Sequence, residues 1–206
     1  MKKVVSLLLV LTMILTLPIF ALAEEDSFGA GTTEENAYWN DSLKIGCTFG
    51  DEWYFYTDDE ILENNQAVAG QLKDDLAEAI REAGTMMDMM AMNTETGENV
   101  NVNLERLSLA SSLIYTEDAY VKASVDQLAS ALEQMGMENV TAEQDEMEFM
   151  GEKHPCIRVS GTLEDLELFE TLAVVKSGRT MIVVTACSYF EDTTADILSS
   201  FYREKP

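Results

Sequence analysis

Histidine, cysteine and basic residues are scarce in this 206-residue sequence, and each shortage narrows the function. One histidine is too few for a zinc site built on several imidazoles, and three cysteines are too few for a small secreted scaffold that depends on disulfides. Thirteen basic residues stand against 38 acidic ones, a net charge of −25. So negative a surface repels phosphate backbones and anionic lipid headgroups, and we expect no nucleic-acid or membrane partner for the mature chain. A cationic protein, peptide or small ligand is the partner that this charge favours.

The cysteines predict buried thiols rather than a disulfide framework. Cys47, Cys156 and Cys187 each stand in an apolar, strand-like pattern, where a free thiol behaves as a small hydrophobic side chain. Cys156 and Cys187 fall in strands separated by a third strand, which places them too far apart for a bridge. The hydrophobic core must therefore supply the stability of the fold.

The first 23 residues have the order of a secretory signal peptide. Lys2 and Lys3 precede an apolar run over residues 4–20, and Ala21 and Ala23 are the small side chains that a signal peptidase requires. The apolar run contains polar residues and a proline and is shorter than the ~20 residues of a spanning helix. We therefore predict cleavage after Ala23 and secretion to an extracellular or periplasmic location. Loss of the two lysines changes the net charge from −25 to −27.

The rest of the chain predicts one domain after a short linker. Residues 24–37 are rich in acidic residues, glycine and threonine and cannot bury enough surface to order themselves, so we expect an acidic flexible tether. Residues 38–206 alternate strand-like and helix-like patterns without an internal repeat, and their length suits a single domain. We expect this domain to be α+β.

The first part of the domain predicts a hairpin followed by a helix. Residues 43–48 and 53–56 are strand-like segments on either side of a glycine-aspartate turn, which is typical of a β-hairpin. Thr57 and Glu60 have the spacing of a capping box, so we expect a helix to begin there. Helical spacing of apolar residues continues to Gly84, a glycine suited to end the helix.

Two strands and a long helix are predicted to follow. The methionine-rich residues 86–92 suit a central strand whose flexible side chains fill gaps on both faces. In residues 100–104, valine and leucine alternate with Asn101 and Asn103, which predicts a strand with one solvated face. Residues 116–136 carry an apolar stripe at helical spacing, which predicts a helix packed on a sheet.

The last third of the chain predicts a four-stranded meander and a closing helix. The predicted strands cover residues 140–150, 154–160, 166–175 and 181–189, and the predicted helix covers residues 193–201. Residues 181–184 are apolar in both alternating sets, so this strand must be covered on both faces. We therefore expect helices on each side of one antiparallel sheet.

The segments 40–45, 53–57, 151–160 and 181–186 are patterns of core and turn residues. Together with the order of the predicted elements, they resemble the PsbP/Mog1-like fold, and in particular small secreted bacterial proteins of unassigned function. The resemblance covers residues 38–202 and implies an α+β domain in which helices sandwich an antiparallel sheet. It also implies a non-enzymatic role, although no functional residue of PsbP or Mog1 proteins has a counterpart here and a fold alone does not give a function.

Residues with catalytic chemistry form no recognisable active site in the sequence. His154 and Cys156 share a face of one strand, but the base of a nucleophile normally comes from another element, so we interpret both as packing residues. No Gly-x-Ser-x-Gly elbow is present. We predict no catalytic residue and no cofactor. A carboxylate-dependent hydrolase stays as the alternative function, because the spacing of two carboxylates is set by the fold.

Metal binding is the other alternative. Thioethers are soft ligands that favour Cu(I), yet alternation places Met86, Met90 and Met92 on one face of a strand and Met87 and Met89 on the other. The acidic clusters lack the register of a calcium-binding loop. We therefore predict no metal ligand and keep calcium or copper binding as a further alternative.

Aromatic residues supply the candidates for ligand binding. Trp53, Tyr54 and Tyr56 lie in one strand pattern, and with Trp39 they could line a groove for a sugar or a peptide. Aromatic pairs across strands are also ordinary core packing. The sequence predicts a secreted, non-enzymatic binding or accessory module with Trp53, Tyr54 and Tyr56 as its candidate site, and leaves ligand, partner and oligomeric state open.

Overall fold

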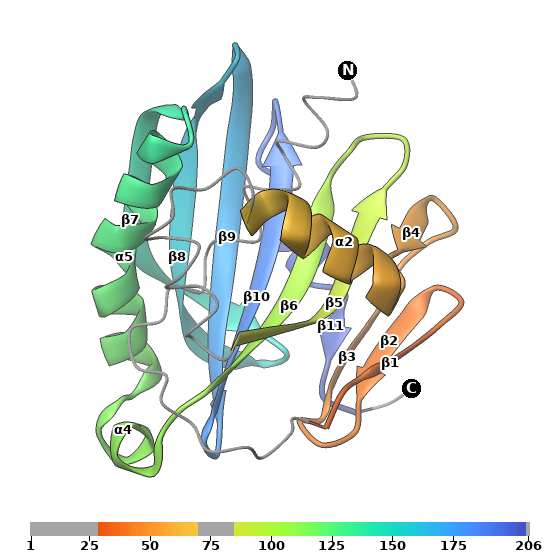
Figure 1. Ribbon diagram of the computed structural model, residues 1–206, viewed down its shortest axis with the longest axis vertical. Helices are drawn as coiled ribbons and strands as arrows, with labels where there is room; N and C mark the ends of the chain where they lie inside the picture. The colour runs from red at the N-terminus through yellow and green to blue at the C-terminus, as the bar shows by residue number, and fades with distance from the viewer. Residues whose placement is uncertain (1–28, 70–84, 205–206) are drawn as a thin grey trace.

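The computed structural model describes residues 29–69 and 85–204, which form an α+β arrangement of two antiparallel sheets with helices (Figure 1). The predicted signal peptide, the start of the predicted tether and the part of the first predicted helix over residues 70–84 lie outside the described residues. The large sheet has seven strands, in the order β4 (Trp53–Phe55), β5 (Thr85–Asn93), β6 (Asn99–Arg106), β10 (Thr180–Tyr189), β9 (Leu166–Ser177), β8 (Glu152–Leu163) and β7 (Glu138–Phe149). The small sheet has four, in the order β1 (Thr32–Glu34), β2 (Ala37–Asn40), β3 (Ile45–Thr48) and β11 (Phe201–Tyr202).

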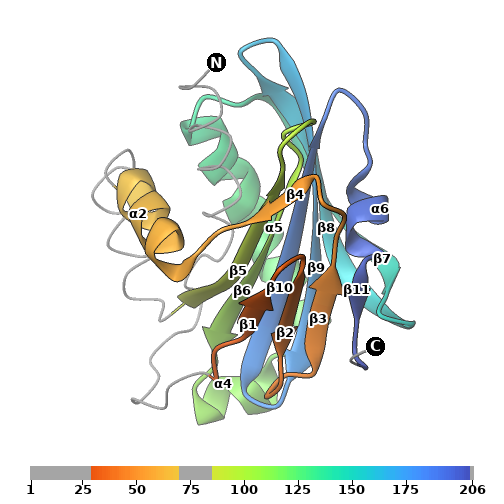
Figure 2. The same ribbon diagram turned by 90° about the vertical axis from the view of Figure 1, so that its right-hand side faces the viewer.

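Different layers cover the two faces of the large sheet. Helices α2 (Asp58–Ala69) and α5 (Glu117–Gln134) lie over one face (Figure 1). The small sheet and the five-residue helix α6 (Thr194–Leu198) lie over the other (Figure 2). The expectation of helices on both sides needs correction for this second face. There the small sheet, with buried side chains such as Tyr38 and Ile45, gives apolar cover where a helix was expected.

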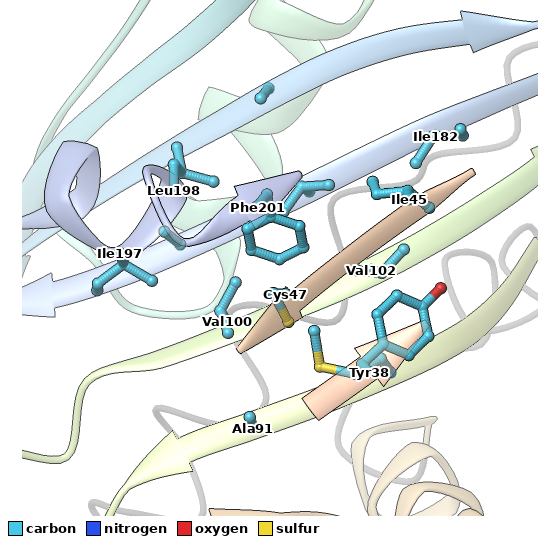
Figure 3. Close-up of a cluster of buried hydrophobic side chains, with 14 of the residues drawn as sticks. Tyr38, Ile45, Cys47, Ala91, Val100, Val102, Ile182, Ile197, Leu198 and Phe201 are labelled. Atoms are coloured by element: carbon cyan, nitrogen blue, oxygen red, sulfur yellow. The ribbon is translucent and has the colours of Figure 1, made fainter. Parts of the chain in front are cut away.

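The hydrophobic core has two parts, one on each face of the large sheet. Beneath the small sheet, Ile45 of β3 meets Val102 of β6 and Ile182 of β10 (Figure 3). Beneath α5, Leu128 packs in a second cluster that includes Val183 of β10. Ile182 and Val183 are neighbours, point into different parts and are 0% and 1% exposed, which confirms that this strand is covered on both faces. The same sheet therefore contributes side chains to both parts of the core.

The predicted starts of two helices are confirmed. Before α2, the Glu60 carboxylate accepts a hydrogen bond from the Thr57 amide at 2.8 Å, and the Thr57 hydroxyl accepts one from the Glu60 amide. Before α5, the Thr116 hydroxyl accepts a hydrogen bond from the Ala119 amide at 3.2 Å. The turn after α5 contains Gly136, whose φ of +93° is one that a glycine adopts without strain.

Two elements near the ends of predicted segments differ from expectation. The predicted helix over residues 193–201 is shorter, because α6 ends at Leu198 and Phe201 pairs with Cys47 as part of β11. A six-residue helix, α4 (Leu109–Ile114), was not predicted between β6 and α5. Its apolar residues do not form the repeated stripe of a core-facing helix, so periodicity gave no signal for it.

The predicted solvated face of β6 is buried. Asn101 is 0% exposed and Asn103 is 2% exposed, because the layer of helices covers this face of the large sheet. The Asn103 side-chain amide donates a hydrogen bond to the Asn101 side-chain oxygen. The polar residues that alternate with apolar ones in β6 therefore form a buried, hydrogen-bonded row. Alternation alone does not distinguish such a row from a solvated face.

The predicted β-hairpin of residues 43–48 and 53–56 is wrong. β3 pairs with β2 and β11 in the small sheet, whereas β4 pairs with β5 in the large sheet. The Phe49 amide donates to Asn36 in continuation of the small sheet, and the Phe49 ring stacks on Trp53 with centroids 4.2 Å apart. The glycine turn thus carries the chain from one sheet to the other, and side-chain stacking replaces strand pairing.

The predicted tether also needs correction at its end. Thr32, Thr33 and Glu34 form β1 and pair with residues 37–39 of β2. These residues bury almost no side-chain surface of their own, which is why composition did not predict order. The backbone of Gly31 is instead held from outside, by the side chain of Asp88.

Asp88 lies at a bulge in the methionine-rich strand β5. Met87 pairs with Asn103 and Met89 pairs with Val102, so Asp88 is an extra residue between them. The alternation of side chains reverses after the bulge. Met89 therefore packs in the core beneath the small sheet together with Met86, instead of pointing to the opposite face as strict alternation predicted.

The Asp88 carboxylate joins three segments that are distant in sequence. It accepts hydrogen bonds from the Tyr38 hydroxyl at 2.6 Å, from the Asn40 side-chain amide at 2.7 Å and from the Gly31 backbone amide at 2.9 Å. A Cβ atom on Gly31 would stand 2.3 Å from the Tyr38 ring, so the approach requires glycine. Asp88 thus fixes β2 and the N-terminal segment against the large sheet.

We expect Asp88→Ala to lower the free energy of unfolding by about 2–4 kcal/mol, because Tyr38 and Asn40 lose a charged hydrogen-bond acceptor in a largely buried site. Asp88→Asn is expected to lose less, since it keeps one acceptor oxygen. Urea unfolding followed by circular dichroism measures the change. Asp126→Ala, an exposed carboxylate of α5, is the matched control. Equal stabilities of Asp88→Ala and the control variant would contradict the role of Asp88.

Candidate functional site

The three aromatic candidates from the sequence do not form one site. Trp53 is 8% exposed and lies in the core beneath the small sheet, stacked on Phe49. Tyr54 and Tyr56 form an edge-to-face pair with centroids 5.3 Å apart, and the Tyr54 hydroxyl donates to the Glu60 carboxylate at 2.8 Å. This bond raises the pKa of Tyr54 and contributes to a lowered pKa of Glu60. Tyr54 is therefore engaged at the start of α2 rather than in a groove.

A different aromatic pair lies on the outer side of the small sheet. Trp39 of β2 and Tyr202 of β11 stack with ring centroids 6.1 Å apart and planes within 19°. The Tyr202 hydroxyl is 3.0 Å from the Thr48 hydroxyl. Both rings lie over Gly46 of the intervening strand, where a Cβ atom would stand 2.6 Å from the Trp39 ring and 3.0 Å from the Tyr202 ring. Glycine at this position lets the two rings approach the sheet.

This pair lines a shallow pocket of about 580 Å³ whose other walls come from β1 and the β1–β2 turn. Glu34 and Glu35 are exposed members of the lining, and Thr32 adds a hydroxyl. None of the described residues that line the pocket is basic. The pocket therefore combines aromatic faces with uncompensated carboxylates, which is the chemistry that attracts a cation.

Sequence reasoning found one part of this pocket and missed the rest. Trp39 was among the aromatic residues considered for a groove, but Tyr202 directly follows the predicted helix over 193–201, and Gly46 lies within a strand pattern. Glu34 and Glu35 fall in the predicted tether. No local signal connects these residues, because strand pairing across the length of the chain brings them together.

Two buried glutamates lie on the helix-covered face of the large sheet. Burial raises the pKa of Glu105 to about 7, against a lowering effect of the hydrogen bond from the Tyr120 hydroxyl at 2.7 Å. Burial raises the pKa of Glu170 to about 8, and neither of its buried carboxyl oxygens has a hydrogen-bond partner. Glu170 thus favours the protonated form at neutral pH, whereas Glu105 titrates near it.

These two carboxyls are too far apart to act as a catalytic pair. Glu105 is opposite Met181 and Glu170 is opposite Cys187, so the two glutamates are six positions apart along β10. Six residues of strand correspond to about 20 Å. Glycoside hydrolysis needs carboxyls roughly 5–9.5 Å apart. The raised pKa values therefore do not support the hydrolase alternative at this pair.

His154 and Cys156 have separate surroundings. The His154 Nδ1 atom is 3.0 Å from the Glu117 carboxylate, which also accepts a hydrogen bond from the Lys176 amide at 2.7 Å. Burial raises the pKa of Cys156 to about 11, so its thiol stays protonated at neutral pH. Cys156 is buried and free, as are Cys47 and Cys187, in agreement with the prediction of buried thiols.

The metal alternatives gain no geometric support. The bulge at Asp88 places Met87, Met90 and Met92 opposite the asparagine row of β6, a different grouping from the one that strict alternation predicted. The Tyr56 hydroxyl points at the Met92 sulfur, 3.7 Å away. Within residues 29–69 and 85–204, no group of three or more histidine, cysteine or acidic side chains is placed to hold a metal ion.

Comparison of the sequence with protein-family models and with curated proteins gives no match. Among solved structures, the chain is similar to LpqN, a protein involved in cell envelope biogenesis of Mycobacterium tuberculosis, with 9% sequence identity, 75% of each chain covered and a TM-score of 0.39. So low a similarity supports no inference from LpqN to this protein, and the PsbP/Mog1-like resemblance stays a prediction. In the described part of the chain, no helix is long and apolar enough to cross a membrane.

Glu170 predicts a pH-dependent stability. Its pKa is raised from 4.5 to about 8 on folding, so its contribution to stability is fully present below pH 4.5 and is lost as the pH rises through 8. We expect Glu170→Gln to remove this loss. As the pH rises, the free energy of unfolding of the original chain should therefore fall more steeply than that of the variant, by up to about 1.4 kcal/mol per pH unit for one proton. Urea unfolding at a series of pH values measures it. Glu143→Gln on exposed β7 should keep the original slope, and the same slope in Glu170→Gln would refute the assignment.

Proposed function

We propose that the protein is a secreted, non-enzymatic binding module that takes a cationic group in the pocket lined by Trp39 and Tyr202. The observation that carries this proposal is the stacked aromatic pair beside exposed Glu34 and Glu35, without a basic residue in the lining. A cation over an aromatic face gains about 0.5–1 kcal/mol at an exposed site, and nearby carboxylates add an electrostatic attraction. The aromatic contact and the carboxylates both favour a positive charge on the ligand.

The shape of the pocket favours a side chain over a large rigid ligand. It is shallow and lies at β1, an edge strand of the small sheet, so a ligand chain can enter and leave along the edge. A lysine or arginine side chain of a basic peptide or protein meets these conditions. Arginine suits the pocket best, because its planar guanidinium can stack on a ring while it donates hydrogen bonds to a carboxylate.

A binding role accounts for the overall charge more directly than catalysis does. The net charge of −25 raises the local concentration of cationic partners and speeds their encounter. The buried glutamates, by contrast, are separated along the sheet and turned toward the helix layer. The pocket and the charge of the chain thus support one class of ligand.

The pocket predicts binding of a short oligoarginine peptide, measured by isothermal titration calorimetry. We expect Trp39→Ala to weaken binding about two- to fivefold, because the aromatic face is lost. The double variant Glu34→Gln, Glu35→Gln should weaken binding as well and reduce its dependence on salt. An oligoglutamate peptide of the same length should not bind.

Glu143→Gln is the control for general charge, because Glu143 is an exposed carboxylate of β7 in the other sheet. It should leave the affinity almost unchanged. If Trp39→Ala binds oligoarginine as well as the original chain does, and Glu143→Gln weakens binding as much as the double variant, the attraction is general and the pocket is not the site.

Export is tested separately by the mature N-terminus. Expressed in a bacterium with its leader, the protein is expected outside the cytoplasm with Glu24 as its first residue, as determined by N-terminal sequencing. Replacing both Ala21 and Ala23 by leucine should block the cleavage, since the peptidase requires small side chains there. Recovery of an intact N-terminus from the original chain would contradict secretion by this signal.

A further inference from the structure

Helix α4 is short and exposes three large apolar side chains. Leu109 is 65% exposed, Leu113 is 81% exposed and Ile114 is 72% exposed, and no residue of the helix is buried. Most large apolar side chains elsewhere in the described chain lie in the core. A contiguous apolar group of this kind on a surface typically marks an interaction site.

Basic residues hold α4 in place at both of its ends. The Arg179 guanidinium Nε donates to the Leu107 carbonyl at 3.2 Å, and the Leu107 amide donates back to the Arg179 carbonyl. The Lys176 ammonium donates to the carbonyls of Ser112 and Tyr115, at the end of the helix. The apolar side chains are therefore presented on a helix whose position is fixed by the β9–β10 turn.

A second pocket lies between the β2–β3 turn and the β9–β10 turn, and Arg106, three residues before α4, is part of its lining. It has a volume of about 350 Å³, and its lining includes Arg106, Arg179 and the hydroxyl residues Ser177 and Thr180. Arg106 pairs with Thr180 in the sheet, which places the two arginines next to each other in space. Guanidinium groups with nearby hydroxyls are the groups that recognise phosphate.

The end of the molecule that carries α4 differs in charge from the whole chain. Figures 1 and 2 both show α4, the β9–β10 turn and the β2–β3 turn at the same end of the molecule. Besides the residues already named, Lys44 lies here, paired at 2.8 Å with Asp41. Among the described residues, the acids close to α4 include Glu117, which accepts from the Lys176 amide, and its exposed neighbour Asp118. In this described part of the chain, apolar and basic side chains thus lie at the same end, and Asp41 and Glu117 are engaged by Lys44 and Lys176.

We propose that this end, the α4 end, docks onto an anionic lipid surface. Leu109, Leu113 and Ile114 enter the region between headgroups and acyl chains, and Arg106 and Arg179 contact headgroup phosphates. Three largely exposed apolar side chains on a short surface helix, with arginines nearby, suit insertion at an anionic lipid surface. A second copy of this chain is disfavoured as the occupant, because it would bring the same arginines and lysines together.

From the net charge we expected no membrane partner for the mature chain, but this charge does not prevent contact at the α4 end. At physiological salt, charges more than about 8 Å apart are largely screened, so the composition of the α4 end decides whether a headgroup can approach. The acidic surfaces elsewhere are repelled from the same layer. That repulsion selects the orientation in which α4 faces the lipid.

Vesicle co-sedimentation tests the proposal with the chain from Glu24 onward, without the hydrophobic leader. We expect binding to phosphatidylcholine vesicles that contain about a third phosphatidylglycerol, much weaker binding to phosphatidylcholine alone, and loss of binding at high salt. The double variant Leu113→Ser, Ile114→Ser should bind anionic vesicles at least about tenfold more weakly, because most of the inserted apolar surface is lost. Arg179→Gln should reduce the preference for anionic lipid.

Two variants serve as controls. Leu62→Ser removes a leucine of α2 that is 55% exposed, and Arg158→Gln removes a basic residue of β8 that pairs with Asp145 at 2.7 Å. Both should bind vesicles as the original chain does. Thermal unfolding by circular dichroism should show all four variants folded, since the substituted leucines and isoleucine are exposed.

Several results would overturn the proposal. These are no binding to either vesicle, equal binding to both vesicles, or equal loss in Leu62→Ser and in the α4 double variant. Sedimentation without vesicles gives a further such result. If the original chain forms a dimer that Leu113→Ser, Ile114→Ser abolishes, then a second copy of the chain, and not lipid, covers α4. Oligoarginine binding at Trp39 is independent of all these outcomes, so the two sites fail or succeed separately.

Discussion

The carboxylate of Asp88 is the interaction on which the arrangement of the two sheets depends. It occupies a bulge in β5 and accepts hydrogen bonds from a tyrosine and an asparagine of β2 and from the backbone before β1. The bulge also sets which methionines face the core. One extra residue therefore determines both the contents of the interior and the position of the small sheet. The Trp39–Tyr202 pocket is built on that sheet, so its geometry follows from the same contact.

The protein has two surface regions of opposite chemical character. The outer side of the small sheet offers aromatic rings and carboxylates to a cationic group. The α4 end offers apolar side chains and arginines to an anionic layer. With α4 on lipid, the small sheet stays open to a soluble or surface-bound basic partner. The two proposals thus describe one molecule that is placed at a surface by one region and recruits a ligand with the other.

Much of the fold could be predicted from the sequence because its signals are local. The capping residues Thr57 and Thr116, and the doubly apolar strand that contains Ile182 and Val183, have the predicted structure. The parts that could not be predicted depend on distant contacts. The segment around Thr32 becomes ordered through pairing with β2, and Asn101 is buried because a helix layer covers it. The pocket joins Trp39 to Tyr202, and no local pattern relates residues at the two ends of a chain.

The three free thiols have a consequence for the conditions under which the chain can fold. Each is enclosed in a different strand, and the described fold closes without any covalent cross-link. Folding therefore does not require disulfide formation, and a reducing cytosol does not prevent the chain from folding there. In the export that we propose, the precursor must be translocated before it folds. The many pairings between remote strands slow folding and so favour translocation.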